Sequence, residues 1–439
     1  MASKGWLTLP AGIGLIAANM IGAGVFLSSG FMAQDMGPGP ILLAWVAGGT
    51  LALLGALSYA ELSRLITGSG GEYRYVGTLW HPMLGSLAGW GSLLLGFSAP
   101  VAIDGFAVGA FLNTLVDGPD PRITGTALIV LLTAAHAGRR WMSAHTQNVL
   151  IALKVFLLMG FIAAGLAMGA SRWPTWSPPA ATDPAAFPTA AFLKNQYWIA
   201  FAFSGWNAAA YVAGEFKDPK RDVPRALLIG CGSVAVLYML VNWIFVANLT
   251  PAELSVVFEY EASRVTLGHA LVEKMGSALG ASAMSVFAIL AFSSAMSAMT
   301  LVGPRVYAEM ARDGYLPTVF AGSGSEPPRW SVMLQGTLAI GLLWTHSLLE
   351  AVESAGGMLL LFSMLSTSGL VLRADARPAY RAAAALYTIG ALGILGYGVA
   401  NNPHQVWWFV GLTVFGSIAY TQRRTTPDDD NASSSAYSA

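Results

Sequence analysis

Apolar runs recur along the whole of this sequence, and they constrain the fold more than any other feature. A run of about 20 apolar residues has the length of an α-helix that crosses the hydrocarbon core of a bilayer. The composition agrees, because 55% of the 439 residues are hydrophobic and 10% are charged, against about 25% charged residues in soluble proteins. We therefore predict an all-α membrane protein with twelve transmembrane helices. They are expected at about residues 10–33, 41–66, 82–113, 122–138, 146–169, 192–214, 225–248, 278–310, 330–347, 351–372, 380–399 and 404–420.

The first of these segments is interrupted at its centre by glycine. Residues 20–26 read MIGAGVF, and each glycine costs about 1 kcal/mol relative to alanine in a helix. In lipid, a broken helix leaves backbone N–H and C=O groups that only protein or a polar cavity can satisfy. The interruption therefore predicts a ligand site built from backbone. The alternative is that Gly22 and Gly24 let another helix pack closely, as small residues do in membrane proteins.

The sixth segment carries a second interruption. Residues 201–207 read FAFSGWN, in which Ser204 and Gly205 break the apolar run and Asn207 adds a polar side chain. The first ten segments then divide into two sets of five, and the odd number makes the second set enter the membrane from the opposite face. Interrupted helices at matching positions of two inverted halves indicate the central site of a transporter. We expect a first repeat in residues 1–170, a second in 171–373, two further helices in 374–421 and a disordered cytoplasmic tail in 422–439.

Basic residues gather on one side of the predicted helices. Placing the N-terminus inside puts Arg64, Arg74 and Arg140 in inner loops with most other Lys and Arg residues, as the positive-inside rule requires. Both termini are therefore expected in the cytoplasm. Among the outer connections, residues 171–190 are expected to be irregular and residues 251–277 to form short interfacial helices.

Several function classes find no support in the sequence. It shows no basic patch for nucleic acid, no His and Cys spacing for a metal and no nucleophile paired with a base. No cofactor, metal site or enzymatic activity is therefore expected. The single cysteine, Cys231, lies inside an apolar segment, which excludes an intramolecular disulfide.

A series of short motifs runs in order through residues 10–330. They are residues 21–26 (IGAGVF), 55–62 (GALSYAEL), 68–73 (GSGGEY), 89–90 (GW) and 201–207 (FAFSGWN), then Glu215, Asp218, Pro219, Arg221, Pro224, Arg225 and Arg305, and residues 311–317 (ARDGYLP). Together they resemble the amino acid–polyamine–organocation superfamily, especially its L-type amino acid transporter branch. The resemblance implies a leucine-transporter-like fold with a five-plus-five inverted repeat. One departure is at Ser28, Ser29 and Gly30, where members of the family often have a proline.

The first break offers backbone groups to the two charged groups of an α-amino acid. Half-helix N-termini present free N–H groups and a positive dipole end, so the amides of Ala23 and Gly24 are expected to bind the carboxylate. Glycine at positions 22 and 24 leaves the backbone open to a ligand. The groups that the resemblance implies for the ammonium are the carbonyls near Met20, Ile21, Phe201 and Ser204.

Around the second break, the resemblance implies roles for side chains. Phe201 matches an aromatic residue that closes over the substrate from outside, with a core phenylalanine as the alternative. Trp206 and Asn207 are expected to line or support the inner side, unless Asn207 only satisfies backbone freed by the break. Ala202 and Gly205 complete the predicted substrate site.

The fifth segment contains Lys154 within its apolar run. A charged side chain inside the membrane costs about 3 kcal/mol and indicates function by default. Sodium-coupled relatives of this fold hold a cation between the first and eighth helices, and the resemblance implies that the Lys154 ammonium substitutes for it. The lysine is then either permanently charged or able to couple a proton. Its predicted partners in the eighth helix, unless they are small packing residues, are Ser293, Ser294 and Ser297.

Other ionisable residues are interpreted from their positions. Asp104, in the outer half of the third segment, is expected to pair with a polar partner near the interface rather than with a substrate side chain. His136, at the inner end of the fourth segment, is expected to be interfacial. Inner-gate ion pairs are expected for Glu61 and Glu72 with Arg64 and Arg74, and for Glu215 with Arg221 and Arg225.

These expectations combine into a sodium-independent secondary transporter of α-amino acids, neutral ones above all, in a bacterial inner membrane. Exchange is the typical mode of the family. The alternatives are proton-coupled uptake, a polyamine or organic-cation carrier, and an amino acid sensor that does not transport. A substrate without a carboxylate leaves the amides of Ala23 and Gly24 without a role. No disulfide-linked heavy chain is expected. Eukaryotic relatives attach theirs through an outer-loop cysteine, whereas the single cysteine here lies inside an apolar segment.

Overall fold

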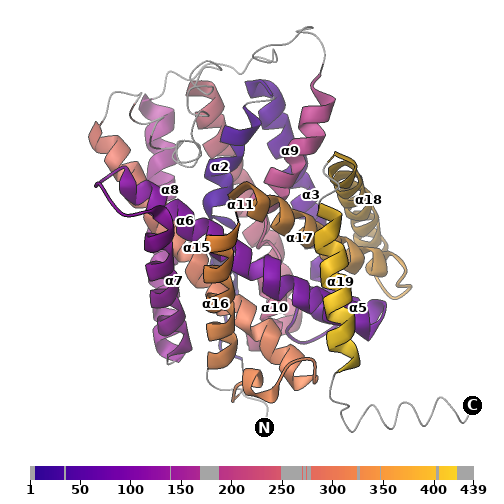
Figure 1. Ribbon diagram of the computed structural model, residues 1–439. Helices are drawn as coiled ribbons and strands as arrows, with labels where there is room; N and C mark the ends of the chain where they lie inside the picture. Colours follow the sequence, from indigo (N-terminus) through magenta and orange to yellow (C-terminus); the bar gives the residue numbers. More distant parts are fainter. Residues whose placement is uncertain are drawn as a thin grey trace, which may run out of the picture.

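The computed structural model describes residues 5–33, 36–138, 140–168, 187–248, 269, 273, 278–323, 327–346, 348–401 and 405–422. These residues form a bundle of helices (Figure 1). The tail beyond residue 422, most of the connection 171–190 and nearly all of residues 251–277 lie outside the described residues. The expectations for those three regions therefore stay predictions.

Helices occupy each of the twelve segments that the apolar runs predict. Six described stretches are long and apolar enough, by length and composition, to cross a membrane, which agrees with a multi-pass membrane protein. The number of crossings and the inverted repeat stay predictions. The α-helices are α1 Leu9–Met20, α2 Ala23–Met32, α3 Pro38–Leu65, α4 Glu72–Leu79, α5 Pro82–Gly91, α6 Ser98–Asn113, α7 Pro121–Ala137, α8 Arg140–Met168, α9 Thr189–Ala202, α10 Ala208–Tyr211, α11 Pro219–Asn248, α15 Ala278–Arg312, α16 Arg329–Thr345, α17 Leu348–Val371, α18 Pro378–Asn401 and α19 Gln405–Thr421.

The interruption of the first segment is confirmed. Helix α1 ends at Met20 and α2 begins at Ala23. Ile21 has left the helical region, with φ −77° and ψ 80°, and the Gly22 amide donates to the Met20 carbonyl at 2.8 Å. The backbone groups next to the break must therefore find partners outside their own helix.

The interruption of the sixth segment is also confirmed. Helix α9 ends at Ala202, and turns lead through residues 203–207 into the short helix α10. Figure 1 shows α2 and α9 side by side in the upper half of the bundle, with α10 in the lower half. Gly205 has φ +93°, a conformation that favours glycine.

The two breaks pack against each other through glycine. A Cβ at Gly205 would lie 2.8 Å from Asn19 Cβ, and a Cβ at Gly24 would lie 2.6 Å from Ala202 Cα. Neither contact is compatible with a side chain unless the backbone moves. Close packing, the alternative that the sequence left open for Gly22 and Gly24, is therefore seen at Gly24, and Gly205 is packed in the same way.

The third segment contains a π-helical turn that the apolar pattern does not predict. Residues Ser92–Phe97 form this turn between α5 and α6. Pro100 lacks an N–H, so it cannot donate to a carbonyl one turn earlier, and the Ser98 hydroxyl donates to the Leu93 carbonyl at 2.7 Å. Helix α6 continues from this turn and packs against α7, α15 and α16.

The N-terminal residues are held against the exit of the second break. The amides of Trp6 and Leu7 donate to the Glu215 carbonyl at 2.8 and 2.9 Å, and the Lys217 amide returns a bond to the Leu7 carbonyl at 3.0 Å. The Glu215 carboxylate accepts from the Trp6 indole and pairs with Arg305 of α15. Arg305 is a partner that the sequence did not predict.

The ion pair predicted for Glu61 with Arg64 is confirmed. The two side chains lie 2.7 Å apart, and Arg377, beyond α17, adds a second guanidinium at 2.5 Å. The Arg377 amide also donates to Glu61, at 3.0 Å. These bonds fasten the end of α3 to the segment that leads into α18.

The contact between the breaks yields a prediction about stability. Replacing Gly205 with alanine forces a side chain into a left-handed conformation and against Asn19, so the variant should lose about 1–3 kcal/mol of stability. Gly160→Ala is the matched control, because a Cβ there meets no atom within 4 Å. Thermal unfolding of the purified variants in detergent measures the difference. Equal melting midpoints for the two variants would contradict the packing role of Gly205.

Candidate functional site

Lys154 lies at the C-terminal end of α1. Its Nζ donates to the Ala18 carbonyl at 3.0 Å and to the Ile21 carbonyl, and the residue is 1% exposed. Carbonyls at the end of a helix lack intrahelical donors and carry the negative end of the helix dipole. The ammonium therefore satisfies groups that the break leaves free.

Asp104 lies at the opposite side of the same break. Its Oδ1 accepts a hydrogen bond from the Ala23 amide at 2.8 Å, at the N-terminus of α2, and the residue is 2% exposed. The expectation of a partner near the interface is wrong, because α6 passes beside α2 inside the bundle. Its other carboxylate oxygen, Oδ2, has no hydrogen-bond partner among the described residues.

Tyr238 of α11 connects the two breaks. Its hydroxyl donates to the Met20 carbonyl and lies 3.0 Å from the Ala202 carbonyl, so one side chain holds the last residues of α1 and α9. The sequence analysis did not single out this tyrosine. A lone tyrosine in an apolar run gives no signal of which helix it faces.

Two of the three serines of α15 that were predicted to bind Lys154 have other hydrogen-bond partners. Ser293 donates to the Ile289 carbonyl at 2.7 Å, and Ser297 is 2.8 Å from Nε2 of His136. The Ser294 hydroxyl is buried and has no partner among the described residues. His136 is 1% exposed, so the interfacial expectation for it is wrong. It is buried because α7 packs against α15.

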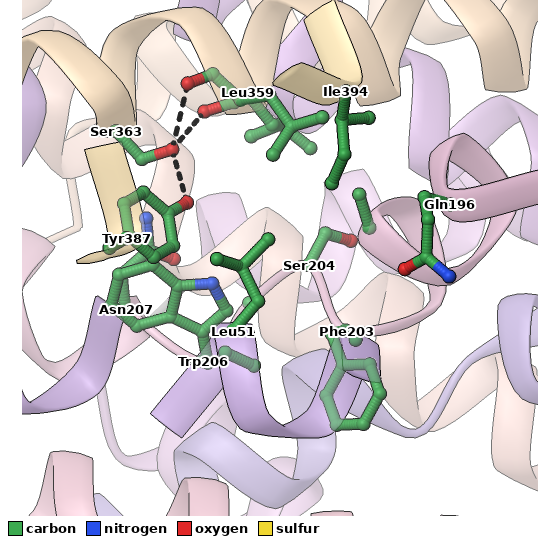
Figure 2. Close-up of a pocket in the computed structure, with 15 residues that line it drawn as sticks. Leu51, Gln196, Phe203, Ser204, Trp206, Asn207, Leu359, Ser363, Tyr387 and Ile394 are labelled. Carbon is green, nitrogen blue, oxygen red and sulfur yellow. Dashed lines mark hydrogen bonds between the residues drawn. The ribbon is translucent and has the colours of Figure 1, made fainter. Parts of the chain in front are cut away.

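A pocket adjoins the second break (Figure 2). It encloses about 500 Å³, including space open to its surroundings, and lies among α3, α9, α17 and α18. Most of its lining is aliphatic or aromatic, and the buried Nε2 of Gln196 has no partner among the described residues. No residue of the first break lines it. From the second break, the lining residues are Phe203, Ser204, Gly205, Trp206 and Asn207.

The predicted aromatic gate, Phe201, is not among the lining residues of this pocket. It lies in the last turn of α9 and is 5% exposed. A Cβ at Gly356 of α17 would lie 3.8 Å from its Cβ. The gating role stays a prediction.

Glu72 lies beneath the second break and is buried without a basic partner among the described residues. Its Oε1 accepts from the Tyr59 hydroxyl at 2.7 Å and from Asn207 Nδ2 at 2.5 Å. Burial raises the pKa of this carboxyl, while hydrogen bonds from Tyr211 and Tyr59 act in the opposite direction.

The predicted pairing of Glu72 with an arginine is therefore wrong. Arg74 follows it by two residues on α4 and reaches Glu309 at 3.4 Å instead. Residues two apart on a helix do not share a face, so the two side chains of α4 have different neighbours. Glu72 instead holds Asn207, and through it the second break, against α4.

The sequence profile of the amino acid permease family matches residues 7–421, which include both breaks, Asp104 and Lys154. The chain belongs to the amino acid permease family. The resemblance to the amino acid–polyamine–organocation superfamily is thereby confirmed, and the permease is accordingly a multi-pass membrane protein. Amino acid permeases act as transporters and not as enzymes.

Curated relatives of this permease carry names of amino acid transporters. The b(0,+)-type amino acid transporter 1 of rabbit is 31% identical over 267 residues, covering 59% of this chain and 54% of the rabbit protein. The Asc-type amino acid transporter 1 of mouse is 29% identical over 339 residues, covering 73% and 61%. The human large neutral amino acids transporter small subunit 2 is 29% identical over 338 residues, covering 73% and 60%. The chain thus spans a little over half the length of these relatives.

The opposite charges of Lys154 and Asp104 yield a second prediction. In Lys154→Met the Asp104 carboxylate stays buried without the cation that interacts with it electrostatically, which should cost about 3–5 kcal/mol of stability. Adding Asp104→Asn should restore part of that loss, because the remaining buried charge is removed. Melting midpoints of the wild type, the two single variants and the double variant give the coupling energy.

Ser98→Ala is the control for this cycle. Its hydroxyl is buried on the same helix as Asp104 and, among the described residues, bonds locally to the Leu93 carbonyl. Its effect should add to that of Lys154→Met. If the stability changes of Asp104→Asn and Lys154→Met also add, the two charges are not coupled.

Proposed function

We propose that this permease is a secondary transporter of α-amino acids that works by alternating access. The observation that carries the proposal is the contact between the two interrupted helices of an amino acid permease. At that contact, backbone amides and carbonyls are bound by side chains instead of by their own helices. Such groups suit the carboxylate and ammonium that every α-amino acid carries.

The substrate site proposed here keeps the predicted backbone groups. The amides of Ala23 and Gly24 bind the carboxylate, and carbonyls near Met20, Ile21 and the end of α9 bind the ammonium. The pocket at the second break takes part of the side chain. Its aliphatic and aromatic lining favours an uncharged substrate side chain, because a buried charge without a partner is costly.

Sodium independence is proposed from the position of Lys154. Its ammonium already provides a positive charge at the C-terminal end of α1, where a bound cation would find the carbonyls of Ala18 and Ile21. Exchange of one amino acid for another is the proposed mode. The proposed setting is a bacterial inner membrane with both termini in the cytoplasm.

A partner linked through a disulfide is not part of this proposal. Cys231, the single cysteine of the sequence, is buried in α11. Its thiol is therefore not presented to another chain.

A carrier of organic cations is the second candidate, and one observation favours it. The Ala23 amide, expected to bind a substrate carboxylate, is occupied by the carboxylate of Asp104. A substrate without a carboxylate does not need that amide. Polyamines therefore belong in any substrate screen alongside the amino acids.

Uptake into proteoliposomes tests the proposed function. Purified protein in liposomes preloaded with neutral amino acids should take up labelled neutral amino acids faster than in empty liposomes. The rate should be the same in sodium and potassium buffers, because Lys154 supplies the charge of the missing cation. Liposomes with Gly160→Ala protein serve as the positive control, and Lys154→Ala should remove uptake. Uptake of polyamines without uptake of any amino acid would establish the second candidate instead.

A further inference from the structure

The first break is already occupied by a carboxylate and an ammonium that belong to the protein. Asp104 binds the Ala23 amide at the N-terminal end of α2. Lys154 binds the carbonyls of Ala18 and Ile21 at the C-terminal end of α1. An α-amino acid carries the same two groups, and its carboxylate would bind where Asp104 now lies.

We propose that Asp104 is a resident competitor for the substrate carboxylate, and that an amino acid binds by displacing it from the Ala23 amide. This inference rests on the proposed function, because it requires a substrate with a carboxylate. It assigns Asp104 a role in specificity that the position of the residue in the sequence does not reveal.

The geometry leaves no place for both carboxylates. A Cβ at Gly22 would lie 3.1 Å from Oδ2 and 3.2 Å from Oδ1 of Asp104, and 3.4 Å from Cβ of Ala295. The carboxylate is therefore packed directly against the backbone of the break. Two anions in contact repel each other strongly in a buried site, so a substrate carboxylate reaches the Ala23 amide only when Asp104 leaves it.

The displaced carboxylate has a charged neighbour to receive it. The titratable groups whose electrostatic interactions with Asp104 are described are Lys154 of α8 and Tyr238 of α11. Oδ2 of Asp104, which has no hydrogen-bond partner among the described residues, is the acceptor, and the Lys154 ammonium is the cation. In the substrate-bound state, Asp104 turns from the Ala23 amide toward Lys154.

Charge balance favours displacement over the binding of an amine by Asp104. An amine would place a second positive charge beside Lys154, with one carboxylate to balance both. An amino acid is a zwitterion and adds no net charge to the buried site. Because an unbalanced buried charge is expensive, the pair of Asp104 and Lys154 suits a zwitterionic substrate.

Binding of paired ligands tests this inference. The probes are the twenty L-amino acids and their α-amides, in which the carboxylate is replaced by a neutral group. Dissociation constants are measured by scintillation proximity for the wild type, Asp104→Asn, Asp104→Ala and the control Ser98→Ala. The readout is the ratio of acid to amide affinity, because a general folding defect weakens both ligands.

We expect Asp104→Ala to bind the acids about tenfold more tightly than the wild type, the size of a lost capping interaction, while the affinity for the amides, which are cations, does not rise. The affinity of Asp104→Asn for the acids should lie between those of the wild type and Asp104→Ala, because the side-chain carbonyl of asparagine still accepts from the Ala23 amide but carries no charge. Ser98→Ala should match the wild type.

Three results would overturn the inference. Unchanged ratios would leave Asp104 with a structural role only. Weaker binding of both acids and amides would show that Asp104 binds the substrate ammonium. If neither the wild type nor the variants bind any amino acid, the proposed function fails, and the competition fails with it.

Discussion

Every backbone group in the membrane needs a partner, and the first break is where this requirement is hardest to meet. Between α1 and α2, the helix can no longer satisfy its own amides and carbonyls. The structure meets the requirement with Asp104 at the amide of Ala23, Lys154 at the carbonyls of Ala18 and Ile21, and Tyr238 at Met20. These side chains come from three different helices, so the break determines how α6, α8 and α11 are arranged around it.

Glycine makes the second break part of the same arrangement. Gly24 lies against the backbone of Ala202, and Gly205 lies against Asn19, so the ends of α1, α2 and α9 are in direct contact. Tyr238 then bonds to carbonyls of both α1 and α9. In the proposed transport cycle, a ligand that separates these ends must replace both the hydrogen bonds and the packing, which would link recognition at one break to movement at the other.

The sequence predicted the parts of this arrangement that depend on local pattern. Apolar runs located the helices, and a small-residue interruption inside an apolar run located both breaks, because a broken helix in lipid leaves backbone groups that need other partners. Lys154 was recognised because a charged side chain inside the membrane is costly. The partners of these groups were harder to predict. Asp104, Tyr238 and His136 each lie within a largely apolar stretch of helix, and their roles depend on which way that helix faces.

The packing of α4 determined the partners of Glu72 and Arg74, and it has a consequence for the proposed alternating access. The sequence predicted an ion pair for Glu72 because an arginine follows it by two residues. Its carboxyl instead bonds to Tyr59 and Asn207 beneath the second break. On the same side, the N-terminal residues pair with the chain at Glu215. In the proposed transport cycle, opening toward this side would detach α4 from Asn207 and the N-terminal residues from Glu215. Glu72 is the carboxyl in this closure that has no basic partner among the described residues, so its bonds to Tyr59 and Asn207 are the ones that the opening must break.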